Sequence, residues 1–186
     1  MSKNHEHKKS SSKKLGIVSL INIIGFVVEL FGGLAFGSIA LLSDAFHMLF
    51  DATAYIIAYI TAHVAETREE SEVWNFGFHR LETMAAFFNG ALLLPMAGYI
   101  IWESYQRYIN PTQIGTLPTL IIGIGGLIVN LISVYYLEGD EMSLNEKGAF
   151  YHLLGDAGGS IAVIISTLTI RYTRILATDP ITAILI

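Results

Sequence analysis

A run of 21 residues without one charged side chain, residues 117–137, places the first limit on the fold of this chain. A helix needs about 20 apolar residues to cross the hydrocarbon core of a bilayer, which is about 30 Å thick. The composition points the same way, because 53% of the residues are hydrophobic, 15% are charged and the mean hydropathy is +0.54. We therefore predict an all-α, integral multi-pass membrane protein.

The apolar segments divide the chain into a bundle of six transmembrane helices. We expect them at residues 15–35, 38–63, 81–102, 117–137, 148–170 and 175–186. The sixth would be about 18 Å long at 1.5 Å per residue, too short to cross, so we expect the chain to stop inside it. Residues 1–14 are polar and basic, which predicts a disordered tail ahead of a transmembrane domain over residues 15–186.

Lysine and arginine predict the orientation of this bundle. With the N-terminus in the cytoplasm, eight of them fall on the inner side: Lys3, Lys8, Lys9, Lys13, Lys14, Arg68, Arg80 and Lys147. Three fall outside: Arg107, Arg171 and Arg174. Cytoplasmic segments carry the excess of Lys and Arg, so a cytoplasmic N-terminus is expected.

Two His-x-x-x-Asp pairs lie inside otherwise apolar segments. His47 and Asp51 stand in the second segment, and His152 and Asp156 in the fifth. Residues four apart share one face of a helix. Ionisable residues are costly within a membrane and mark ion pathways. Two nitrogens and two oxygens form a donor set suited to tetrahedral zinc.

The pairs also predict a common depth. Asp51 would lie about 20 Å, and Asp156 about 21 Å, from the outer ends of their helices. The similarity between HMLFDA and HLLGDA predicts an inverted repeat of three helices plus three, whose substrate site lies near mid-membrane. Gly155, Gly158 and Gly159 would let the two backbones approach closely. A structural alternative is that these polar residues only hold helices together, but two equally spaced pairs favour the metal.

Other polar residues leave several roles open. Asp44, three residues before His47, could orient the imidazole, accept a proton along the exit path, or simply meet water at the start of the helix. Glu29 is a weaker candidate for the same proton path, because membrane helices also use such groups to bind one another.

Several function classes lack support in the sequence. Cysteine is absent, which excludes thiolate ligands and disulfides. There is no His-Glu-x-x-His motif and no phosphate loop, and a four-ligand site argues against a metal-dependent hydrolase, so we do not expect an enzyme. Basic residues are not interleaved with aromatics, so no nucleic-acid partner is expected.

The motifs resemble those of the cation diffusion facilitator family, in its zinc-transporter-like branch. The resemblance rests on SIALLSDAFHMLFDA, FGFHRLETMAAFFNG, GLIVNLISVYYL, HLLGDAGGS and ATDPITAILI, and covers about residues 15–186. It implies a homodimeric exporter that moves zinc out of the cytosol in exchange for protons, with Cd²⁺ or Co²⁺ as other cargo. It also implies that His47, Asp51, His152 and Asp156 form the transport site.

Two features depart from the family pattern. The segment between the fourth and fifth helices has no histidine before His152, and the usual cytosolic C-terminal domain is absent from this sequence. We expect an exporter in the cell (inner) membrane. The alternative is a metal-binding membrane subunit, or a fragment of a transporter, that does not itself transport.

Overall fold

The computed structural model describes residues 2–67, 77–138 and 144–186; within these ranges it leaves undescribed the side chains of residues 2–15, 55, 57–67, 77–86, 88–90, 92, 93 and 144–149. The described residues form six α-helices and no strand. The helices are α1 (Ser2–Phe36), α2 (Ile39–Thr67), α3 (Gly77–Ile109), α4 (Thr116–Leu137), α5 (Leu144–Thr173) and α6 (Thr178–Leu185).

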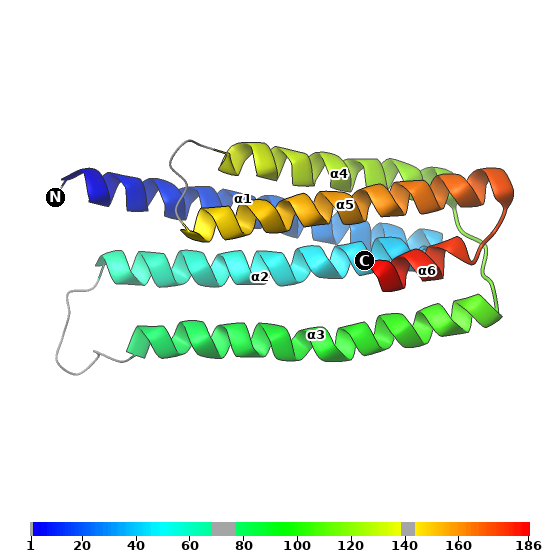
Figure 1. Cartoon of the computed structure of the whole chain (residues 1–186), viewed down its shortest axis with the longest axis horizontal. Helices are drawn as coiled ribbons and strands as arrows, with labels where there is room; N and C mark the ends of the chain where they lie inside the picture. The colour runs from blue at the N-terminus through cyan, green and yellow to red at the C-terminus, as the bar shows by residue number, and fades with distance from the viewer. Residues whose placement is uncertain (1, 68–76, 139–143) are drawn as a thin grey trace.

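Successive helices run in opposite directions along one axis (Figure 1). Helix α1 packs against α2 and α4, and α4 packs against α5. The short α6 contacts α2, α3 and α5, so it closes the bundle at the end where α2 begins. Helix α2 therefore touches helices from both halves of the chain, and the side chains it carries have several possible partners.

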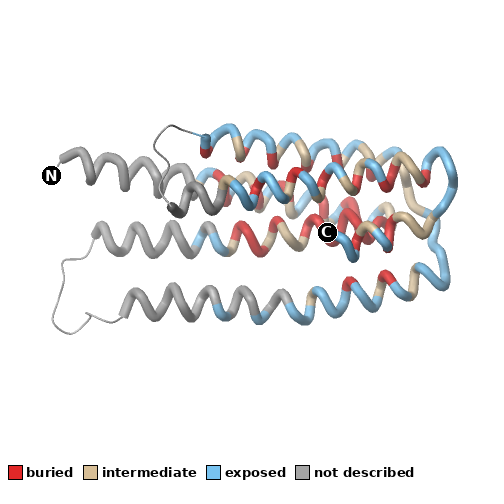
Figure 2. Tube along the Cα trace, in the orientation of Figure 1, coloured by how far each residue is buried: buried red, intermediate tan, exposed pale blue. Residues whose placement is uncertain are grey.

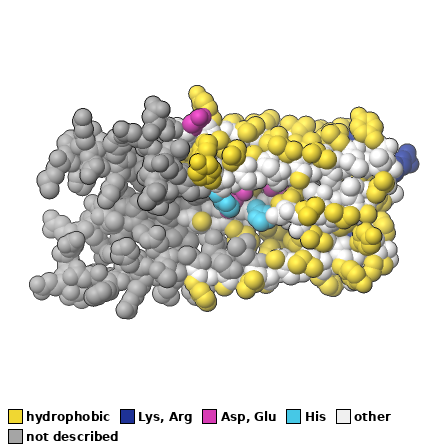
Figure 3. All heavy atoms as spheres, viewed as in Figure 1, with side chains coloured by type: hydrophobic (Ala, Val, Ile, Leu, Met, Phe, Trp, Pro, Cys, Tyr) yellow, Lys and Arg dark blue, Asp and Glu magenta, His cyan; other side chains and the backbone are white. Residues whose placement is uncertain are grey.

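The polar and apolar residues are arranged as in a protein whose solvent is lipid. Large hydrophobic side chains cover the outside of the described part, and Figure 3 shows them spread over the face in view. Buried positions follow the inward-facing sides of α1, α2 and α5 (Figure 2). Many of these are polar: Ser19, Asn22, Glu29, Asp44, Asp51, Asn130, Ser133, Ser160 and Asp179 are all nearly inaccessible. Polar groups buried in a bundle with an apolar exterior are typical of membrane helices.

Three of the helices are long and apolar enough to cross a membrane, as judged over the described residues. They are Gly16–Phe36, Thr116–Leu137 and Phe150–Thr173. These match the first, fourth and fifth predicted segments, so the all-helical prediction is confirmed. Much of the second and third predicted segments lies outside the described side chains, and six crossings, the orientation and the inverted repeat stay predictions.

The predicted helix boundaries were wrong mainly where polar residues flank a helix. Helix α1 begins at Ser2, whereas the first apolar segment was predicted from residue 15, and the disordered tail over residues 1–14 stays a prediction. That segment contains no Gly or Pro before Gly16, and extending an existing helix is far easier than starting one. Helix α3 likewise runs to Ile109, beyond the predicted end at residue 102, with Pro95 inside it.

A tight turn joins α1 to α2 and fixes how α2 begins. Gly37 has φ +74°, a conformation that glycine adopts without strain. The backbone of Phe36 accepts a hydrogen bond from Gly115, and that of Gly37 accepts one from Arg107. The break predicted between residues 35 and 38 is therefore confirmed.

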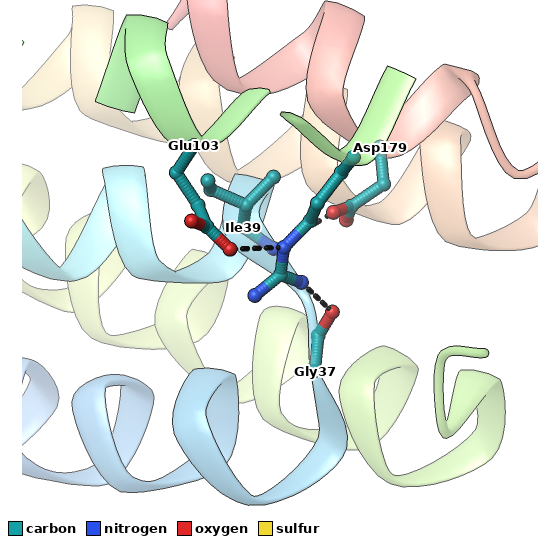
Figure 4. A network of polar contacts seen from close by, with 5 residues as sticks. Gly37, Ile39, Glu103 and Asp179 are labelled. Atoms are coloured by element: carbon teal, nitrogen blue, oxygen red, sulfur yellow. Dashed lines mark hydrogen bonds and ion pairs between the residues drawn. The ribbon is translucent and has the colours of Figure 1, made fainter. Parts of the chain in front are cut away.

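The start of α2 is capped by a side chain from α6 (Figure 4). Ser38 Oγ donates to Asp179 Oδ1 over 2.6 Å, and the Ile39 N–H donates to Asp179 Oδ2 over 2.7 Å. Arg107 reaches the same place from α3, where its Nε also lies 2.8 Å from Glu103 Oε1. A carboxylate favours the positive end of a helix dipole, so Asp179 holds α6 against α2.

Candidate metal centre

Three of the four predicted ligands meet between α2 and α5. One ligand atom each from Asp51, His152 and Asp156 lies within 4.8 Å of the other two. Asp51 comes from α2 and the other two come from α5, one helical turn apart. The predicted common depth of the two carboxylates is therefore confirmed. Figure 3 shows imidazole and acidic side chains gathered together partway along the bundle.

The three groups differ in exposure. Asp51 is buried, with 8% of its side chain accessible, whereas 54% of the His152 side chain is accessible. His152 Nε2 and Asp51 Oδ1 form a direct ion pair. The cluster thus has a buried carboxylate at its back and an imidazole at its open side, which gives an ion a way in.

Two carboxylate oxygens in this cluster have no hydrogen-bond donor. Asp51 Oδ2 and Asp156 Oδ2 are both buried and unpartnered. Buried polar atoms normally have partners, and a buried anion needs a compensating charge. One imidazole nitrogen with two carboxylates is a donor set that zinc accepts. The residues present therefore fit a divalent cation.

His47 does not join this cluster. It lines a separate cavity of about 250 Å³ together with Phe46 and Phe50 of α2, Met96 of α3 and Ala183 of α6. Four residues advance a helix by slightly more than one turn, so positions 47 and 51 differ in direction by about 40°. Because α2 is flanked by both α5 and the α3–α6 pair, this difference turns the two side chains toward different neighbours. The structure therefore brings three of the four predicted ligands together, and the place of His47 in a four-residue site stays a prediction.

The glycines of α5 were also partly misjudged. A Cβ placed on Gly155 or Gly158 would meet nothing within 4 Å, so neither position requires a small residue for contact with α2. At Gly159 the added atom would lie 3.3 Å from Asp44 Oδ1. The close approach of α5 to α2 therefore occurs one turn beyond Asp156, at Gly159.

Polar contacts join α2, α4 and α5 at that level. Ser160 Oγ donates to Asp44 Oδ2 over 2.8 Å, and Asn130 Nδ2 donates to Ser160 Oγ over 3.1 Å. Asp44 Oδ1 has no partner, so Asp44 does not orient the imidazole of His47. The sequence singled out Asp44 but not Ser160. Ser160 lies four residues after Asp156 on the same helix face, and that spacing could have identified Ser160 from the sequence.

Glu29 approaches Asp44, Asn130 and Ser160, which we call the polar layer, from α1. It is 1% exposed, and neither carboxylate oxygen has a hydrogen-bond partner. Its Oε1 occupies the space into which a side chain at Gly126 of α4 would project. Glu29 therefore takes part in no interhelical hydrogen bond, contrary to the structural role that membrane helices often give such groups.

Comparison with known proteins agrees with this picture. A family profile described as the cation efflux transmembrane domain matches residues 15–186. The chain is 38% identical over its whole length to zinc transporter ZitB of Pectobacterium atrosepticum, of which the match covers 59%. It is 36% identical to a cadmium, cobalt and zinc/H⁺-K⁺ antiporter of Bacillus subtilis, with 98% of this chain and 60% of that protein covered.

A third relative is the metal cation efflux system protein CzcD of Cupriavidus metallidurans. It is 37% identical, and the match covers 98% of this chain and 58% of the relative. The chain thus spans about six tenths of the length of these curated relatives. All three names describe transport proteins for metal cations.

Proposed function

The chain belongs to the cation efflux family, and from that premise we propose that it carries zinc out of the cytosol across a membrane. It is a membrane protein by family and by its apolar helices. The relatives named above transport zinc, cadmium or cobalt by their printed names, so Cd²⁺ and Co²⁺ are the other cargoes to test. The ion is a substrate and not a resident cofactor.

One observation carries this proposal: Asp51, His152 and Asp156 meet inside a bundle whose exterior is apolar. An ion at this place is surrounded by helices and not by a water-exposed loop. Mixed nitrogen and oxygen donors favour zinc over the hard cations Mg²⁺ and Ca²⁺, which prefer oxygen alone. The accessible face of His152 supports a site that an ion enters and leaves.

His47 is the fourth ligand in this proposal. It stands one turn from Asp51, and the cavity beside it gives its side chain room to change rotamer. A tetrahedral shell of His47, Asp51, His152 and Asp156 would then form when α2 turns by the small angle that separates positions 47 and 51. The same turn would close the cavity on the α3–α6 side.

Protons are the proposed counter-ion. Zinc binding requires a neutral imidazole and ionised carboxylates, so each zinc that binds competes with protons at the same atoms. One relative is named as a zinc/H⁺-K⁺ antiporter, which supports exchange. In this proposal the chain works as a homodimer with six crossings, arranged as an inverted repeat of three helices plus three. It lies in the inner membrane with its N-terminus in the cytosol.

Zinc flux into sealed proteoliposomes tests the function. The purified chain should move Zn²⁺ across the vesicle wall and move protons in the opposite direction, as followed by two fluorescent indicators. Asp156→Asn should abolish both signals, whereas Glu138→Gln, at an exposed residue beyond the end of α4, should leave both intact. Zinc binding without flux in the wild type would instead favour a metal-binding subunit that does not transport.

A further inference from the structure

The polar layer around Asp44 has more carboxylate oxygens than hydrogen-bond donors. Glu29 and Asp44 are each 1% exposed, and three of their four carboxylate oxygens have no donor. Among the described side chains the ion pairs are Arg107–Glu103 and His152–Asp51, so neither carboxylate is paired with a cation. An unpaired buried carboxylate is very costly, and such a group is stabilised by binding a positive charge or a proton.

A second observation points to a ligand at the same place. Asn130 is completely buried, and its Oδ1 has no partner although its Nδ2 donates to Ser160. A Cβ built on Gly126 would collide with Glu29 Oε1 and lie 3.7 Å from Ser160 Oγ, so the carboxyl and the hydroxyl face the same small space without a hydrogen bond between them. Acceptor oxygens on α1, α2 and α4 therefore lack hydrogen-bond donors around the hydroxyl of Ser160.

The packing favours a proton over a metal ion. Glu29 lies against the backbone of Gly126, and Asp44 lies against Gly159, so the carboxylates already fill the space left by two missing side chains. A hydrated or many-coordinate cation needs more room and more ligands than this. A proton needs only one oxygen and supplies the donor that the layer lacks.

We propose that Glu29, Asp44 and Ser160 form a buried proton-binding site separate from the zinc ligands. The Glu29 carboxylate takes up a proton as an O–H group, which a rotation of the Glu29 side chain would bring to the free lone pair of Ser160 Oγ. Ser160 in turn donates to Asp44, and Asn130 holds the hydroxyl in place. Loss of the proton reverses these steps. The role of this site in transport rests on the proposed exchange of zinc for protons, whereas its ability to bind a proton does not.

The surroundings limit what else could hold that proton. Asp44 interacts electrostatically with two other acids, Asp51 on α2 and Asp156 on α5. Glu29 interacts electrostatically with Asp44. Asp179 on α6 is occupied by Ser38 and the Ile39 N–H. Asp44 lies seven residues from Asp51, about 10 Å along α2, so the proton site is separate from the metal cluster.

Infrared spectroscopy of the full chain in lipid vesicles tests this assignment without zinc. The metal-free protein at neutral pH should show the C=O stretch of a protonated carboxylic acid, shifted in D₂O. Glu29→Gln should lose that band, whereas Glu138→Gln should keep it. A band that is absent from the wild type, or unchanged in Glu29→Gln, would overturn the proposal.

A second variant serves if Glu29→Gln does not fold. Ser160→Ala removes the hydrogen-bond partner and should shift the band, and an unshifted band would count against the site. Zinc flux measured in the same vesicles separates the two proposals. Flux without a band dependent on Glu29 would remove the proton site alone, whereas such a band without flux would remove the transport function alone.

Discussion

Asp51 combines two properties that make it the central residue of the metal cluster. One oxygen is paired with His152 from another helix, and the other is buried without a donor. A residue that only joined two helices would be expected to satisfy both oxygens. Asp156 likewise has one buried oxygen without a hydrogen-bond partner, and it lies one helical turn from His152. The two carboxylates therefore carry the negative charge available to a cation.

We expect Asp51→Asn and Asp156→Asn each to weaken zinc binding by more than about 100-fold. Loss of a group that only supports a ligand typically costs 10- to 100-fold, and a direct ligand should cost more. Isothermal titration of the purified chain with Zn²⁺ measures this. Asp179→Asn is the matched control, because Asp179 is also a buried aspartate but caps α2. Equal affinities in all four proteins would contradict the assignment.

His47 gives a separate prediction at the residue scale. If it completes the shell, His47→Asp should shift preference from Zn²⁺ toward harder cations such as Mn²⁺, because oxygen replaces nitrogen. Competition uptake with both metals present measures the ratio. An unchanged ratio would show that His47 stays in the cavity beside α3 and α6 throughout transport.

At the scale of helices, glycine controls how closely α1, α2 and α4 approach. A side chain at Gly33 would meet the backbone nitrogen of Leu42 at 3.1 Å, and one at Gly32 would meet Ile122. Both glycines therefore lie where a larger residue would push neighbouring side chains apart. In α4 the neighbouring glycines differ: Gly126 lies against Glu29, whereas Gly125 faces open space.

This difference predicts opposite effects of two adjacent substitutions. Gly126→Ala should destabilise the protein by about 1–3 kcal/mol, because the methyl group must displace the buried Glu29 carboxyl. Gly125→Ala should be neutral or slightly stabilising, since alanine favours a helix. Thermal unfolding in detergent, followed by circular dichroism, compares them. Equal losses from both variants would show that α4 does not pack on Glu29.

The sequence predicted the presence of the helices better than their end residues. It also predicted the candidate ligands better than the neighbouring helix that each ligand faces. Apolar length identified residues 117–137 to within one residue of α4. It could not show that the polar segment 2–14 continues α1, because helix extension depends on the helix that precedes or follows it. Counting residues from the outer helix ends correctly placed Asp51 level with Asp156. It could not show which neighbour His47 faces, since that depends on where α3 and α6 pack.

For the whole molecule, exchange predicts that zinc affinity falls as the pH is lowered. Protons and zinc compete for the same imidazole and carboxylate atoms, and histidine titrates near pH 6.5 when unperturbed. The decrease should be steep between about pH 7.5 and pH 5.5, with protons released as zinc binds. Calorimetry in buffers of different ionisation enthalpy counts them. A count near zero across this range would leave the metal cluster without a role in proton exchange.

Locating the ion itself tests the central claim most directly. Crystals of the full chain grown in lipid with Zn²⁺ should show anomalous scattering at the zinc edge between α2 and α5. The peak should lie about 2.0–2.2 Å from His152 nitrogen and from oxygens of Asp51 and Asp156. A zinc-loaded protein with peaks only elsewhere, and with Asp51 and His152 still paired to each other, would contradict the account.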